Sequence, residues 1–264
     1  MGEDIQPLLD DWPHDSGRLC VRKIVGEDGR EKVQLRIEMG ILQMEISGRP
    51  DGQRPHGYES LLHYYQVQAQ RTRQQGGEQS GYQLDAEGCM ALQIEAIQFY
   101  HRRISFLELG DYERAKMDAE RNLMLFDFVK RYAADEEDRM VMEPHRPFVV
   151  GHRVRAATLM KLEAGDYDDA LREIEVGIEE IQAFFREFDR PDLQEESEEV
   201  VFLREWAEEI RKDRPRSPKQ DLKEQLREAV AIEDFERAAE LRDRLSALSR
   251  GGREAKEARR IDNV

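Results

Sequence analysis

The chain begins with alternating apolar and polar positions and then changes to helical spacing. Between residues 18 and 47 apolar side chains recur at every second position, which predicts β structure. From about residue 57 to residue 248 they recur at intervals of three and four, which predicts amphipathic helices. The pattern therefore predicts a mostly α fold of α-helical hairpin repeats, with a small N-terminal β-hairpin or sheet and a C-terminal helical hairpin.

The β segment contains a strong turn signal and one irregularity. Asp28-Gly29 lies between two alternating runs, which is typical of a β-hairpin. If these two residues form the centre of the turn, Ile24 faces Val33 across the strands. After Gly40 the apolar positions change from odd to even, which predicts a β-bulge at this glycine. A tight turn at Gly40, giving a third strand, is the alternative.

The helical body contains a short sequence that occurs twice. Leu-Gly-Asp-Tyr-Glu-Arg-Ala at 109–115 reappears as Ala-Gly-Asp-Tyr-Asp-Asp-Ala at 164–170, an offset of 55 residues. In each copy we expect Gly to end one helix, Asp to cap the next, and Tyr and Ala to pack across the turn. The run resembles the turn of a tetratricopeptide repeat, although that family has a period of about 34 residues. We therefore expect related helical hairpins and no regular superhelix, with a loop or short helix at about 130–147.

The last part of the chain predicts two short amphipathic helices that fold back on each other. Ile232-Glu233-Asp234 is the only place to turn, and Asp234 is a good N-cap for the second helix. Ser217, Pro218 and Gln220 fit a capping box at the start of the first helix. A hairpin this short cannot bury both apolar stripes alone, so it needs a second surface in this protein or on another. The expected partner-binding residues are Leu222, Leu226, Phe235, Ala238, Ala239, Leu241, Arg242, Leu245 and Leu248.

This hairpin resembles a known motif, most specifically in the stretch Asp-Phe-Glu-x-Ala-Ala-x-Leu-Arg-Asp at 234–243. Roughly residues 217–250 resemble the UVR motif, named for the B and C subunits of the bacterial nucleotide-excision repair nuclease. In that family the hairpin pairs with another UVR hairpin, and the motif also occurs in bacterial Clp ATPases and stress-response regulators. The resemblance implies a protein partner: a repair subunit, a Clp-type ATPase, or a second copy of this chain in a homodimer.

These patterns together divide the chain into five parts. Prolines and glycines separate the β segment from the helices, and a basic Arg-Pro stretch precedes the hairpin. An acidic amphipathic helix is expected from Asp192 to Asp213, ahead of that stretch. The predicted parts are an N-terminal segment (1–55), a helical tetratricopeptide-like body (56–210), a linker (211–216), the UVR hairpin (217–250) and a charged tail (251–264).

The charge of the chain is unevenly distributed. The total net charge is −16, and residues 1–210 hold 45 acidic and 26 basic residues, a net charge of −19. An acidic body argues against direct nucleic-acid binding, because phosphate contacts need Lys and Arg. The basic stretch from Arg211 to Lys219 is the one plausible patch that could face phosphates.

The sequence also indicates the compartment. Its two cysteines, Cys20 and Cys89, are far apart and provide no disulfide framework, which fits a reducing cytoplasm. The first residues lack the basic and apolar regions of a signal peptide. No apolar run approaches the roughly 18–20 residues that span a membrane. We therefore expect a soluble, cytoplasmic protein.

A search for catalytic and metal-binding patterns finds little. His145 and His152 lie seven apart, and a metal site would also need Glu143 or His101, so packing or surface histidines are favoured. The loop Gly48–Gly57 combines arginines, a histidine and an aspartate with prolines; a ligand site is one interpretation, and a plain β-to-α connection is favoured. No phosphate-binding loop or nucleophile elbow occurs. We expect no catalytic, cofactor-binding or metal-binding residue and no cofactor.

Three functional hypotheses follow. The first is a non-enzymatic interaction or adaptor protein whose hairpin docks onto another UVR hairpin or partner protein. The first alternative is an accessory factor of nucleotide-excision repair that contacts DNA weakly through the basic stretch. The second alternative is an enzyme of unrecognised class with a site between the β segment and the helices.

Overall fold

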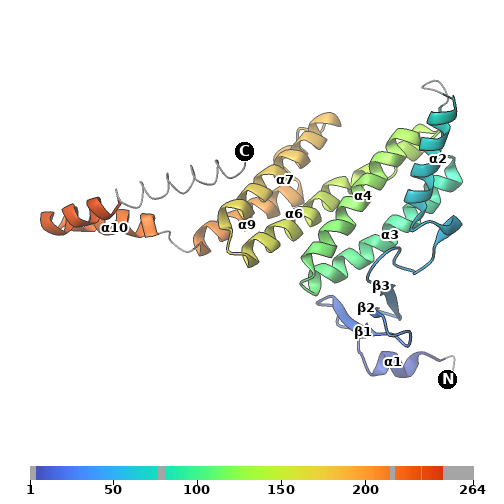
Figure 1. The fold of residues 1–264 in the computed structure, drawn as a ribbon, viewed down its shortest axis with the longest axis horizontal. Helices are drawn as coiled ribbons and strands as arrows, with labels where there is room; N and C mark the ends of the chain where they lie inside the picture. The colour runs from blue at the N-terminus through green and yellow to red at the C-terminus, as the bar shows by residue number, and fades with distance from the viewer. Residues whose placement is uncertain (1–3, 77–80, 215–217, 233, 246–264) are drawn as a thin grey trace. The chain divides into compact units, whose positions relative to one another are not determined.

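The computed structural model describes residues 4–76, 81–214, 218–232 and 234–245, and it confirms the predicted fold class. The chain forms two compact units, Met1–Glu209 and Ile210–Val264 (Figure 1). The first unit carries the sheet and the helical body, and the second carries the C-terminal hairpin. Of the predicted boundaries, the linker at 211–216 overlaps a helix, because α9 (Glu198–Asp213) continues to Asp213.

The sheet has three antiparallel strands in the order β1-β2-β3: β1 (Cys20–Val25), β2 (Glu31–Ile37) and β3 (Gly40–Glu45). Ile37 pairs with Gly40, so β2 and β3 are joined by a two-residue turn. The predicted β-bulge at Gly40 is wrong, and the alternative third strand is correct. A two-residue turn pairs odd positions with even ones, as in Leu35 with Leu42. The apolar residues therefore stay on one face although their numbering changes parity.

The register between β1 and β2 differs by one residue from the predicted register. Ile24 pairs with Lys32, not with Val33. The Gly26 N–H donates to the Arg30 carbonyl at 2.8 Å, which leaves a three-residue loop that ends at Gly29. Gly29 has φ of 73°, the left-handed conformation that three-residue hairpin loops require at their last position. Asp-Gly was the correct turn signal, but the loop contains one residue more than a two-residue turn.

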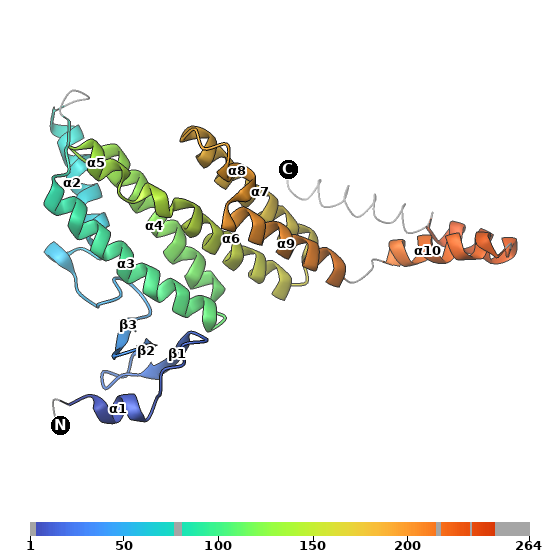
Figure 2. The ribbon, with the colours of Figure 1, turned by 180° about the vertical axis from the view of Figure 1, so that it is seen from behind.

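The helical body is built from two antiparallel hairpins. The first joins α3 (Ala86–Glu108) to α4 (Tyr112–Tyr132), and the second joins α6 (Arg146–Glu163) to α7 (Tyr167–Glu187). The two hairpins pack through α4 and α6, so the four helices form a row in the order α3, α4, α6, α7 (Figure 2). The remaining described elements of this unit are α1 (Gln6–Asp10), η1 (Pro55–Gly57), α2 (Leu61–Gly76), α5 (Glu136–Met140), η2 (Glu143–His145) and α8 (Leu193–Glu196).

The repeated Gly-Asp turns have equivalent backbone geometry in both hairpins. Gly110 and Gly165 have φ of 73° and 77°, and each follows the end of a helix. The N–H groups of Asp111 and Asp166 each donate to a carbonyl five residues earlier, which is the Schellman pattern. Asp111 and Asp166 stand at the predicted N-cap positions of α4 and α7, but neither side chain hydrogen bonds to its helix. Asp111 instead accepts hydrogen bonds from Lys23 at 3.1 Å and from Arg114 at 2.6 Å, which ties the sheet to this turn.

The helix predicted from Asp192 is divided in two. Ser197 has extended backbone angles (φ −63°, ψ 142°) and separates α8 from α9. Its hydroxyl accepts a hydrogen bond from the Val200 N–H at 3.4 Å, at the start of α9. A serine competes well for backbone donors at a helix start, which is why the break falls there.

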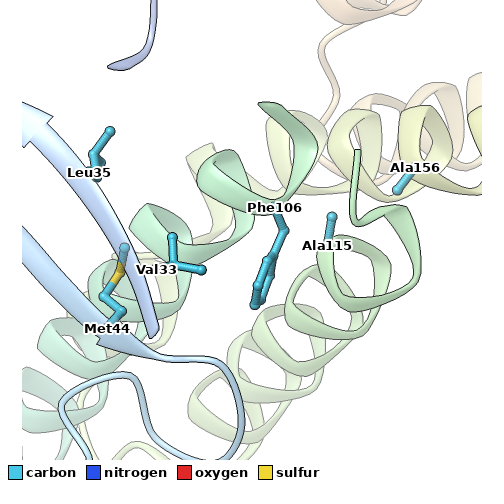
Figure 3. Close-up of a cluster of buried hydrophobic side chains, with 6 residues drawn as sticks. All are labelled: Val33, Leu35, Met44, Phe106, Ala115 and Ala156. Atoms are coloured by element: carbon cyan, nitrogen blue, oxygen red, sulfur yellow. The ribbon is translucent and has the colours of Figure 1, made fainter. Parts of the chain in front are cut away.

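The sheet packs on the helical body through a shared apolar cluster (Figure 3). Val33, Leu35 and Met44 lie on one face of the sheet and contact the C-terminal half of α3. Phe106 of α3 is fully buried in this cluster, together with Ala115 of α4 and Ala156 of α6. The alternation of the strands and the helical stripe of α3 therefore meet in one core.

Candidate interaction surface on the C-terminal hairpin

The C-terminal unit forms the predicted helical hairpin. Its first helix is α10 (Pro218–Ala231), and residues 235–245 form the second. The Asp234 N–H donates to the Ala229 carbonyl at 2.9 Å, which closes the end of α10. The Asp234 carboxylate accepts a hydrogen bond from the Arg237 N–H at 3.1 Å, which confirms its predicted role as N-cap.

The two helices of the hairpin contact each other through an inner face. Ala229, Ala238 and Leu241 are buried there, and Leu222 and Leu226 pack against them. Two alanines at the contact let the helix backbones approach closely, and the leucines fill the space on either side. Part of the predicted apolar surface is therefore used within the hairpin itself.

A second set of residues of the hairpin is exposed, and we call this set the outer face. Phe235 is 69% exposed, Val230 is 52% exposed and Ile232 is 70% exposed. Ala239 and Arg242 are also exposed, and they follow Phe235 at intervals of four and seven, so the three lie on one side of the second helix. Val230, Ile232 and Phe235 are thus three exposed large apolar side chains near the turn of the hairpin, and Arg242 lies two helical turns beyond Phe235 on the same side.

The predicted partner-binding residues thus fall into two groups. Leu222, Leu226, Ala238 and Leu241 hold the hairpin together, whereas Phe235, Ala239 and Arg242 belong to the outer face. Leu245 is partly buried at the end of the second helix. Leu248 lies outside the described residues, as do Ser217 and the side chain of Gln220 in the predicted capping box.

The sequence interpretation missed two members of the outer face. Neither Val230 nor Ile232 was among the expected partner-binding residues, and Ile232 was assigned only to the turn. A signal was present in the sequence, because Ile232 is a large apolar residue at the predicted turn of a short hairpin. The β-branched pair Val230 and Ile232 therefore marks the turn end of the hairpin as an apolar surface.

The other predicted candidate sites in the first unit have internal partners. Arg49, in the loop Gly48–Gly57, lies 3.4 Å from the buried carboxylate of Glu95 and 3.2 Å from Asp51. The Gly48 carbonyl accepts a hydrogen bond from Arg102 at 2.8 Å. These contacts favour the interpretation of this loop as a structural connection from the sheet to the helices.

His152 and the other candidate metal ligands do not converge. The Nδ1 atom of His152 accepts a hydrogen bond from Nε of Arg103 at 3.1 Å, and Glu143 pairs with Arg146. Across residues 4–76, 81–214, 218–232 and 234–245, no group of three or more potential ligands gathers in one place. Within the same ranges, no helix combines the length and apolar character needed to cross a lipid bilayer.

Comparison with known proteins bears on the hairpin alone. Neither a curated protein nor a solved structure matches the chain. The family model described as "UvrB/uvrC motif" matches residues 218–251, which span α10, the Asp234 turn and the second helix. The C-terminal unit of this chain therefore carries a UVR motif, which relates it to excision repair or protein interaction.

Proposed function

We propose that this chain is a non-enzymatic adaptor protein whose C-terminal hairpin docks through its outer face onto a second UVR hairpin. The observation that carries the proposal is the exposed apolar patch of Val230, Ile232 and Phe235 on a hairpin whose inner face is already occupied. Burying large apolar side chains is the main driving force of association, and an exposed aromatic residue is a typical anchor.

The geometry supports a helical partner. The outer face follows one side of a helix at intervals of four and seven, which suits packing against another helix. Arg242, on the same side of the second helix as Phe235, pairs with its exposed neighbour Asp243 at 2.9 Å, and such an exposed pair can exchange for a partner carboxylate. The candidate partners are a second copy of this chain, a repair subunit and a Clp-type ATPase.

The charge of the body favours a protein partner over DNA. Residues 1–210 carry a net charge of −19, which repels a phosphate backbone at low salt. An accessory role in repair would on this view operate through a protein contact. A titration of the chain with DNA at low salt separates the protein adaptor from the repair factor that contacts DNA. DNA binding at low salt would favour the repair factor.

The experiment compares the full chain with the variant that carries Val230→Ala and Phe235→Ala. Both side chains are exposed and alanine favours helix, so the hairpin should stay folded. Self-association is measured by sedimentation velocity, and binding of purified UVR-containing proteins is measured by titration. We expect the wild type to associate with itself or with one of the UVR-containing proteins. The variant should bind that partner with an affinity about tenfold lower or weaker still.

The matched control removes equally exposed apolar side chains from the helical body. Val176→Ala plus Met117→Ala deletes two side chains that are 62% and 59% exposed, on α7 and α4. This control should associate like the wild type. Equal association of the outer-face variant, or a wild type that binds neither itself nor any UVR hairpin, contradicts the proposal.

A further inference from the structure

A cavity of about 330 Å³ lies in the helical body, between α3, α4 and the start of α6. Its walls are largely apolar and include Ala96, Ile97, Phe126, Phe148 and Val149. Ile97 and Phe148 are partly exposed, so the cavity opens at their side. A volume of this size falls at the lower end of the range for pockets that bind small organic molecules.

Arg103 forms part of this wall and is almost completely buried, with 1% of its surface exposed. Its Nε donates to Nδ1 of His152 at 3.1 Å, but its Nη1 is buried with no hydrogen-bond partner. The nearby carboxylate of Asp118 is occupied by Arg102, which it binds at 2.7 and 2.8 Å. A buried guanidinium with an unused donor is unfavourable unless an anion compensates it.

The nearest negative charge, Asp118, only partly offsets the burial of Arg103, because its carboxylate is hydrogen-bonded to Arg102. Burial lowers the pKa of Arg103 to about 10, which reports an environment that disfavours its charged form. Burial, together with Arg103 and Arg155, lowers the pKa of His152 to about 3, so this imidazole is neutral at pH 7. The rings of Tyr100 and Phe148 lie 5.5 and 6.0 Å from the guanidinium carbon, near the limit of a cation–π contact.

Besides Arg103, the polar residues that line the cavity are two amides, a tyrosine and a histidine, and none of the lining residues is acidic. A ligand that fits must therefore bring its own negative charge to Arg103 and an apolar body to the remaining walls. The guanidinium fork matches the geometry of a carboxylate better than that of a spherical anion. We propose that this cavity binds a small organic molecule with an apolar body and one carboxylate, which pairs with Arg103.

The proposal is tested by calorimetric titration of the full chain with octanoate, 1-octanol and octylammonium. The three probes share an apolar tail and differ in the charge of the head group. We expect octanoate to bind at least about tenfold more tightly than octanol, and octylammonium to bind more weakly still. Because the comparison uses the wild-type chain, it does not depend on the folding of any variant. Equal affinity for the three probes, or no binding of octanoate, overturns the proposal.

Two variants locate the site. Arg103→Met should lose the preference for octanoate over octanol and keep the apolar contacts, whereas Arg172→Met, at an exposed arginine of α7, should behave like the wild type. Ile97→Trp enlarges a half-exposed side chain at the opening of the cavity and should prevent both octanoate and octanol from binding. This test does not depend on whether the Arg103 variant folds. Octanoate binding that survives Arg103→Met or Ile97→Trp contradicts the assignment.

Discussion

Arg102 and Asp118 form a buried bidentate ion pair, with Nε to Oδ2 at 2.8 Å and Nη2 to Oδ1 at 2.7 Å. The remaining Nη1 of Arg102 donates to the carbonyls of Glu45 and Gly48, at 2.9 and 2.8 Å. One guanidinium thus joins α3, α4 and the end of the sheet. The side chains of Arg102 and Asp118 are both buried, so the pair is sensitive to the loss of either member.

We predict that Asp118→Ala lowers the free energy of unfolding by roughly 3–5 kcal/mol, because it leaves the Arg102 charge buried and unpaired. Urea denaturation measures the loss. The double variant Arg102→Met plus Asp118→Leu should recover part of it, since no isolated charge remains. A double variant less stable than Asp118→Ala would show that the carbonyl contacts of Arg102 outweigh the ion pair.

The buried histidine predicts a pH dependence of stability. The pKa of His152 is lowered from 6.5 to about 3, first by burial and then by the neighbouring charges of Arg103 and Arg155. Between these two pH values the unfolded chain binds more protons than the folded chain at this residue. Its contribution to stability is therefore complete above pH 6.5 and is lost as the pH falls toward 3.

His152→Gln tests this dependence, because glutamine accepts the same hydrogen bond and does not titrate. The difference in melting temperature between the wild type and this variant should change steadily from pH 7 to pH 4, in favour of the variant at low pH. Parallel curves for wild type and His152→Gln would show that this histidine does not resist protonation.

Close packing between α6 and α7 predicts an effect of one glycine. A Cβ at Gly177 would overlap the side chain of Val154, whose Cγ1 would lie only 3.0 Å away. We predict that Gly177→Ala lowers the free energy of unfolding by about 1–3 kcal/mol, despite the better helix propensity of alanine. Adding Val154→Ala should relieve the overlap and recover part of the loss.

Gly151 supplies the matched control, because its added Cβ would meet only Glu199 at 3.6 Å, an ordinary contact. Gly151→Ala should therefore be neutral or stabilising by up to about 1 kcal/mol. Thermal and urea denaturation of both variants check the pair. A Gly177→Ala variant as stable as Gly151→Ala would mean that α6 and α7 separate at little cost.

The division of the C-terminal hairpin into inner and outer faces predicts different effects of two substitutions. Leu241→Ala removes a side chain buried against α10, and we expect a local loss of about 2–4 kcal/mol. Val230→Ala removes an exposed side chain and should cost less than about 0.5 kcal/mol. Hydrogen exchange of the α10 amides in the full chain measures both. Equal protection in the two variants would show that the faces are not distinct.

Much of this architecture could be predicted from local sequence. The spacing of Leu92, Phe99 and Phe106 predicts α3, and each repeated Gly-Asp turn ends a helix because glycine alone adopts positive φ at no steric cost. The hairpin turn at Asp234 follows in the same way from an aspartate that caps its helix. These features depend on residues within one or two turns of each other, and the sequence contains all of that information.

Contacts between distant segments required the tertiary structure. The loop at Asp28 took one residue more than predicted, and in the resulting register Val21 and Lys23, not Cys20 and Ile24, share the packed face of the sheet with Leu35 and Val33. Arg103 follows Phe99 by four residues on α3, but the sequence does not show that its Nη1 would be buried without a hydrogen-bond partner. The sequence determined which elements form and where they end. Only the packing of those elements decided which charges are buried and compensated, and which apolar side chains stay exposed for a partner. The reason is that the burial of a side chain depends on neighbours that are distant along the chain.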